Sequence, residues 1–291
     1  MAAACGSGEP KERGHTDLIL VDDTGDTSTG DDTGAAPEPE VCAPPSLTQV
    51  AQFEHLDIAD VEFFDPPIAL ASCGWGMAAV DLNGDGAVDL LPLGHTDPTR
   101  ALINQEGSLV PTDEVRFDGG PLPAGNGIGV GDVNADGLPD LVLLRSTGHA
   151  DLLFTNLGHG QFASAELPDS STESQDGAFF DADLDGDLDL YVSRHIDIWE
   201  TIAPEIAAGT IRGEANRLYI NHDGELSPVD TAGVVDAASF QAVPIDVDTD
   251  GDLDLYIVND FGMFIAPNSL LINDGSGTFS EASDCGCALE M

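Results

Sequence analysis

The chain has 291 residues, of which 54 are Asp or Glu and only 8 are Lys or Arg, so its formal net charge is −46 at pH 7. An apolar fraction of 42% is enough to build a hydrophobic core and excludes wholesale disorder. So few basic residues argue against nucleic acid and anionic membrane surfaces, whose binding depends on clustered Lys and Arg. Divalent cations are the natural counter-charge, and an acidic surface that serves solubility alone is the alternative.

The N-terminal sequence MAAACGSGEP resembles the end of a bacterial lipoprotein signal, in which small residues precede a Cys and a Gly/Ser tether follows it. This resemblance implies lipidation at Cys5, an anchor that would be the protein's only contact with a membrane. An ordinary N-terminal Cys in a secreted protein is the alternative. Residues 6 to about 45 mix Gly, Thr, Asp and Pro and predict a flexible acidic linker, so we expect the chain to divide into 1–45 and 46–291.

Four further cysteines form an even set that predicts structural disulfides in an oxidising, extracytoplasmic compartment. Their pairing is open, and the sequence has neither a CxxC motif nor a Cys/His cluster with zinc spacing. These cysteines are Cys42, Cys73, Cys285 and Cys287.

From about residue 46 the sequence is dominated by an internal repeat. Four segments align, with their first acids 51, 49 and 65 residues apart: VDLNGDGAVDLLPLG, GDVNADGLPDLVLLR, DADLDGDLDLYVSR and DVDTDGDLDLYIVN. Each is followed by a second shared piece that contains an Asn (Asn104, Asn156, Asn221 and Asn273). Short β-type runs flank both pieces and predict four strands per repeat, which is typical of the blades of a β-propeller.

The acidic loops of the repeats, at 81–89, 132–140, 181–189 and 246–254, have the form DxNxDGxxD or DxDxDGxxD. Oxygen-bearing side chains stand at positions 1, 3, 5 and 9, and the Gly at position 6 permits a left-handed backbone. These side chains belong to Asp81, Asn83, Asp85, Asp89, Asp132, Asn134, Asp136, Asp140, Asp181, Asp183, Asp185, Asp189, Asp246, Asp248, Asp250 and Asp254. Position 7 varies, so we expect it to offer only its carbonyl while its side chain faces outward; it is Ala87, Leu138, Asp187 and Asp252.

This pattern predicts up to four Ca²⁺ ions, because calcium takes six to eight hard oxygen ligands from a tightly curled loop. Magnesium is the rival ion, and its strict octahedron suits such a cage less well. An EF-hand is rejected, since position 12 lacks the required Glu and a β-run follows the loop. Positions 1, 3, 5 and 9 carry four acids in each of the last two loops and three in each of the first two. This predicts tighter binding in the last two loops, with affinity overall near about 0.1–1 mM.

The signatures DxDxDGxxDL and LxxNxGxGxF resemble the FG-GAP/VCBS repeats of integrin-α-like proteins over about residues 76 to 282. The resemblance implies an all-β fold, a β-propeller of four-stranded antiparallel blades, with calcium bound between the first two strands of each blade. Propellers of this family usually have seven blades, whereas four acidic loops occur here. Both a complete four-bladed ring and part of a larger propeller stay open.

The connections between second and third strands should lie at the end opposite the calcium loops, where we expect a protein or glycan partner to dock. Candidate contact residues there are His95, His149, His195, Trp199 and Phe264. The sequence lacks the GxSxG, HExxH, Walker and dinucleotide motifs and singles out no catalytic residue. We therefore expect an adhesion or interaction module; a calcium-dependent polysaccharide hydrolase or lyase and a purely structural surface protein are the alternatives.

Overall fold

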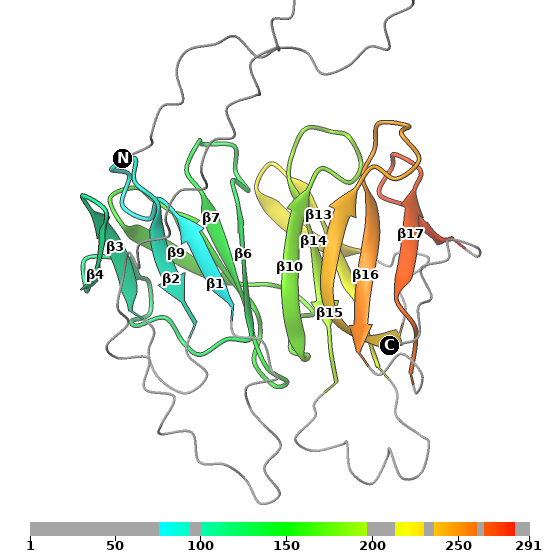
Figure 1. Ribbon diagram of the computed structural model, residues 1–291, viewed down its shortest axis with the longest axis horizontal. Helices are drawn as coiled ribbons and strands as arrows, with labels where there is room; N and C mark the ends of the chain where they lie inside the picture. The colour runs from blue at the N-terminus through cyan, green and yellow to red at the C-terminus, as the bar shows by residue number, and fades with distance from the viewer. Residues whose placement is uncertain (1–75, 94–99, 197–212, 230–235, 261–264, 283–291) are drawn as a thin grey trace, which may run out of the picture. The chain divides into compact units, whose positions relative to one another are not determined.

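The structure, a computed structural model, describes residues 76–93, 100–196, 213–229, 236–260 and 265–282 (Figure 1). The chain divides into two units, Met1–Gln49 and Val50–Met291, and every described residue belongs to the second. The described residues form strands and turns, with no helix among them that is long and apolar enough to cross a membrane. The expected all-β fold is confirmed for this part of the chain, whereas Cys5, the linker and the other four cysteines lie outside it.

Among the described residues, sixteen of the strands form four antiparallel sheets that follow one another along the chain. The first sheet consists of β1 (Met77–Val80), β2 (Asp89–Pro92), β3 (Ala101–Gln105) and β4 (Ser108–Thr112). The second consists of β6 (Gly127–Gly131), β7 (Asp140–Leu144), β8 (Leu152–Asn156) and β9 (Gln161–Glu166). The third consists of β10 (Ser174–Phe180), β11 (Asp189–Arg194), β13 (Arg217–His222) and β14 (Glu225–Val229). The fourth consists of β15 (Asp236–Ile245), β16 (Asp254–Asp260), β17 (Ser269–Asn273) and β18 (Phe279–Glu281).

Within each sheet the strands lie in chain order, each antiparallel to the next, so the expectation of four strands per repeat is confirmed. Two further strands were not predicted. The strand β5 (Arg116–Phe117) pairs in parallel with β9, and β12 (Glu214–Ala215) pairs with β15 of the following sheet. Each has only two residues, too few to produce a period-2 pattern in the sequence.

The sheets contact one another through their first strands, since β1 lies beside β6, β6 beside β10 and β10 beside β15 (Figure 1). Strand β6 approaches β10 closely. A Cβ atom at Gly127 would clash with the Gln175 carbonyl, and one at Gly129 would lie 2.7 Å from the Gly177 carbonyl oxygen. Glycine at these two positions therefore permits the spacing between the second and third sheets.

Apolar side chains between successive sheets form three core clusters, one for each pair of neighbours. Every residue of β7 and β11 is buried, because the second and third sheets have a neighbour on both faces. In contrast, β2 alternates buried and half-buried residues, and β16 does so over most of its length. The first and fourth sheets thus bury one face each.

At the end opposite the acidic loops, a polar side chain just before the third strand forms a hydrogen bond to the next sheet. Asp151 accepts hydrogen bonds from the Arg145 N–H at 2.7 Å and from the Ser174 hydroxyl of the next sheet at 2.7 Å. Asn216 has the same place in the third sheet, where it accepts from the Arg194 N–H at 2.7 Å and donates to the Ser239 hydroxyl at 2.9 Å. A carboxylate and an amide thus perform the same joining role in successive repeats.

Burial raises the pKa of Asp151 from its ordinary value of 3.8 to about 7. The hydrogen bonds from Ser174 and Arg145 and the positive charges of Arg194 and Arg145 lower the pKa, but burial outweighs them. Folding therefore takes up a proton at this carboxyl between these two pH values. Since the folded protein then binds more protons than the unfolded chain, the contribution of Asp151 to the free energy of unfolding falls as the pH rises from about 4 to about 7.

Substituting Asp151→Asn, which reproduces the arrangement at Asn216, should remove this pH dependence. We expect the free energy of unfolding of the wild type, relative to the variant, to fall by about 1 kcal/mol per pH unit between pH 5 and pH 7. Urea unfolding of both proteins across this range at fixed ionic strength measures the difference. Parallel pH profiles for the two proteins would contradict the assignment.

Candidate metal centres

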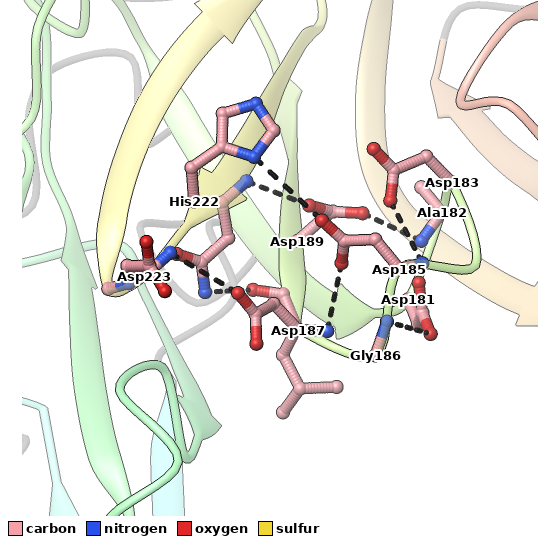
Figure 2. A network of polar contacts seen from close by, with 12 residues as sticks. Asp181, Ala182, Asp183, Asp185, Gly186, Asp187, Asp189, His222 and Asp223 are labelled. Atoms are coloured by element: carbon pink, nitrogen blue, oxygen red, sulfur yellow. Dashed lines mark hydrogen bonds and ion pairs between the residues drawn. The ribbon is translucent and has the colours of Figure 1, made fainter.

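Each acidic loop connects the first and second strands of its sheet and is curled by hydrogen bonds from its own backbone to its carboxylates. In the third loop the Gly186 N–H donates to Asp181 Oδ2 at 3.0 Å and the Asp187 N–H donates to Asp185 Oδ1 at 2.9 Å (Figure 2). The equivalent bond to the first Asp in the second loop, from Gly137 to Asp132, is 2.8 Å long. The predicted glycine at position 6 has a left-handed backbone in all four loops, with φ between 86° and 102°.

A second left-handed residue, at position 4, was not predicted. It is a glycine only in the first loop, and elsewhere it is Ala135, Leu184 or Thr249 with φ of 55°, 62° and 66°. For a residue with a Cβ this conformation is energetically unfavourable, and it persists only where surrounding contacts enforce it. Alanine, leucine and threonine give no sequence signal for a left-handed turn, so the left-handed backbone at position 4 could not be predicted from the residue type.

The Asp at position 9 is fully buried in every loop, and both of its carboxylate oxygens accept backbone hydrogen bonds. In the second sheet Asp140 accepts from the Val133 N–H at 2.9 Å and from the Asn156 N–H at 2.7 Å. The same two bonds occur at Asp89, Asp189 and Asp254. Position 9 therefore fastens the start of the loop to the end of the third strand.

The shared Asn of each repeat joins the loop to its own sheet and, in the third and fourth sheets, to the preceding one. Asn221 Nδ2 donates to the Leu188 carbonyl of its own loop at 3.0 Å and to the Val133 carbonyl of the second loop at 2.7 Å. Asn273 Nδ2 donates to the Ala182 carbonyl of the third loop at 2.8 Å. The loops are consequently part of the joint between sheets.

Two groups of carboxylates among the described residues are close enough to share one cation. In each group three ligand oxygens lie within 4.8 Å of one another. The groups are Asp181, Asp183 and Asp189 in the third loop and Asp246, Asp248 and Asp254 in the fourth. In the first and second loops position 3 is Asn, and the Asn83 amide donates to Asp85 Oδ2 at 3.0 Å.

The third loop also contains a carboxylate oxygen that fits a cation. Asp181 Oδ1 is buried and accepts no hydrogen bond from any described residue. A buried carboxylate oxygen without a donor is costly, and coordination to a cation would satisfy it. Burial also raises the pKa of Asp189 to about 6, and the charges of Asp183 and Asp185 add to this effect. The donor set, oxygen only and negatively charged, suits a hard divalent ion.

Position 7 differs from the expectation in the fourth loop. Asp252 was expected to face outward, but its residue is only 5% exposed and its Oδ1 is buried without a hydrogen-bond partner among the described residues. Burial and the neighbouring carboxylates of Asp250, Asp254 and Asp248 raise its pKa to about 6. The fourth loop thus contains a fifth carboxylate close to its acidic group. In the third loop Asp187 accepts from the Asp223 N–H at 3.2 Å (Figure 2).

Of the residues predicted to face a partner, two are described. His149 is exposed in the turn between β7 and β8. His195 is 2% exposed, and its ring stacks on Phe240 at a centroid distance of 4.6 Å and lies 3.7 Å from an oxygen of Asp260. The placement of His195 on a partner-facing surface is therefore wrong: it lies where the third and fourth sheets meet, and burial lowers its pKa. His95, Trp199 and Phe264 lie outside the described residues.

Residues 81–143 and 132–192 match the FG-GAP-like repeat, and the matched segments contain the first three acidic loops. No curated protein matches the sequence.

Three solved structures are similar over part of the chain. A lectin of Agrocybe aegerita that recognises non-reducing terminal N-acetylglucosamine is 16% identical, with a TM-score of 0.44 over 69% of this chain and 49% of the lectin. The V. cholerae biofilm matrix protein Bap1 is 14% identical, with a TM-score of 0.41 over 71% of this chain and 30% of Bap1. The Tc holotoxin pore of Photorhabdus luminescens is 20% identical, with a TM-score of 0.35 over 71% of this chain and 9% of the pore protein. The chain spans about half or less of each of these proteins.

The two roles of the loop acids can be separated by substitution in the second loop. Asp140→Ala would leave two buried N–H groups without an acceptor, so we expect a loss of about 2–5 kcal/mol in the free energy of unfolding. Asp136→Ala in the same loop changes an exposed residue and should cost less than about 1 kcal/mol. Urea unfolding of both variants in the presence of a chelator tests this, because metal binding then contributes nothing. Equal losses would contradict the joining role of position 9.

Proposed function

We propose that this protein is a calcium-binding, extracytoplasmic β-propeller that acts as an adhesion or interaction module. The observation that carries the proposal is the third loop, where three carboxylates can share one cation and a buried oxygen of Asp181 accepts no hydrogen bond from the described residues. The fourth loop adds a second group of the same kind. The match of residues 81–192 to FG-GAP-like repeats supports the same proposal.

Calcium is the cation that suits these loops best. The donors are carboxylate, amide and carbonyl oxygens, and calcium accepts six to eight of them in flexible geometry. Magnesium needs a strict octahedron and keeps several waters, which a loop crowded with carboxylates accommodates less well. The protein's own residues hold the loop in place: position 9 is fixed by two backbone N–H groups, while positions 1, 3 and 5 provide the remaining charge.

The order of the sheets supports a propeller. Four-stranded antiparallel sheets follow one another with their first strands adjacent, and each successive pair buries an apolar core. In a propeller, each blade packs its faces against those of its neighbours in this way. The acidic loops and the turns between third and fourth strands then share one end, which leaves the connections between second and third strands for a partner.

Calcium should stabilise the fold by mass action. At a calcium concentration about 100 times the dissociation constant, each occupied site adds about 2.7 kcal/mol, which for two sites corresponds to a rise in Tm on the order of 10 °C. Thermal melting with calcium, magnesium or chelator measures the shift, and calorimetric titration measures the number of sites.

Substituting Asp183→Asn or Asp248→Asn should each remove part of this shift, because each removes a carboxylate from one of the two groups. Asp118→Asn, which changes an exposed acid outside the loops, should leave it intact. A melting temperature that does not respond to calcium in the wild type would rule out the calcium sites.

The partner we propose is a glycan or a protein at the end of the sheets opposite the loops. Binding to glycan arrays and to intact cells should occur with calcium and be lost with chelator, because the loops hold the sheets in place. His149→Ala, an exposed change in that end, and Trp199→Ala, at the predicted contact point outside the described residues, should weaken binding without lowering the melting temperature. Shortened oligosaccharides after incubation with the protein would instead favour the hydrolase or lyase alternative.

A further inference from the structure

The three interfaces between successive sheets use the same positions of the repeat, which gives each sheet two distinct faces. The forward face, directed to the next sheet, carries positions 2, 11 and 13 counted from the first Asp of the loop. The rear face, directed to the preceding sheet, carries positions 10 and 12. In the second interface, Val133, Val142 and Leu144 of the second sheet pack on Leu190 and Val192 of the third.

The fourth sheet has a forward face that no described residue covers. The exposure of the residue at position 2 of the loop shows the difference. Leu82, Val133 and Ala182 in the first three loops are at most 3% exposed, whereas Val247 in the fourth is 45% exposed. Beside it, Val243 on β15 is 40% exposed. The apolar residues of this face on the loop, β15 and β16 are Val243, Ile245, Val247, Tyr256 and Val258, and the exposed Gln241 lies opposite Val258 on the same face.

The first sheet has the complementary rear face uncovered. Met77 on β1 is 55% exposed, and the neighbouring Ala79 is also exposed. Positions 10 and 12, Leu90 and Pro92, are half-buried, whereas their equivalents in the second sheet, Leu141 and Leu143, are completely buried. At each of the three interfaces within the chain, a rear face packs on a forward face. The two uncovered faces, the forward face of the fourth sheet and the rear face of the first, are therefore of complementary types.

The hydrogen bonds at the loop end extend this complementarity. In the third and fourth sheets the shared Asn donates to the position-2 carbonyl of the preceding loop, as Asn273 does to Ala182. In the first sheet the Asn104 amide donates to the Val88 carbonyl of its own loop at 3.1 Å, the bond that Asn221 also makes to Leu188. Asn221 and Asn273 also donate to the position-2 carbonyl of the preceding loop. The Asn104 amide could make the equivalent bond to the Val247 carbonyl of a docked fourth sheet.

We propose that the forward face of the fourth sheet docks onto the rear face of the first sheet in a second copy of this chain. The occupant follows from the repeat, because a rear face of this kind is what covers the forward faces of the first three sheets. The interface is heterologous, since different surfaces of the two copies meet. It is apolar, so salt that screens the repulsion between two strongly acidic chains should strengthen the association. The inference does not rest on calcium binding.

Sedimentation equilibrium of the full chain tests the proposal at several protein and salt concentrations. We expect an assembly of two or more chains that becomes more populated with added NaCl. A double substitution, Val243→Lys with Ile245→Lys, should reduce the mass to that of one chain, and so should Met77→Lys on the opposite face. Leu157→Lys, an equally apolar exposed residue in a turn of the second sheet, is the matched control and should leave the mass unchanged.

Mixing the variants identifies which faces meet. The forward-face variant retains an intact rear face and the Met77 variant retains an intact forward face, so an equimolar mixture should form a one-to-one dimer. Circular dichroism and melting confirm that each variant is folded. A wild type that is monomeric at every concentration and salt level would overturn the proposal. A Met77 variant that still self-associates would also overturn it, because the fourth sheets would then dock on each other.

Discussion

A carboxylate that accepts two backbone hydrogen bonds holds together three parts of every sheet: the beginning of the acidic loop, the second strand and the end of the third strand. Asp140 illustrates the constraint, since it is completely buried and binds the N–H groups of Val133 and Asn156. Two N–H donors compensate a buried charge only if both are aimed at it. The position of this one Asp therefore determines where the loop must begin and end.

The other acids of the loop can then serve a different purpose. Positions 1, 3 and 5 accept hydrogen bonds from the loop backbone and stand at or near the surface, as Asp185 does. The shared Asn brings the neighbouring sheet to the same place, because Asn221 reaches the carbonyl of Val133 in the preceding loop. A cation held by one loop would consequently act on the contact between two sheets as well as on a turn.

Much of this arrangement could be predicted from the sequence, because it repeats. Four aligned acidic segments predict the four sheets, and the short β-type runs around each loop and each shared Asn predict four strands in each of them. Features that are not part of the repeated pattern could not be predicted. The two-residue strands β5 and β12 have no pattern of their own. The sequence predicts His195 in an exposed connection, yet its ring is buried and stacks on Phe240, a contact between sheets that no local signal encodes.

The electrostatics of the loops connect their structural and their proposed binding role. Burial raises the pKa of Asp189 to about 6, and burial with its neighbouring carboxylates does the same for Asp252. A raised pKa means that the folded protein holds the charged form less favourably than the unfolded chain does, so these groups lower the free energy of unfolding at neutral pH. A proton relieves this cost only near or below pH 6, whereas a divalent cation relieves it at neutral pH and leaves the carboxylates ionised. Protons and the calcium ions that we propose are therefore alternative counter-charges for the same loops, and they must compete.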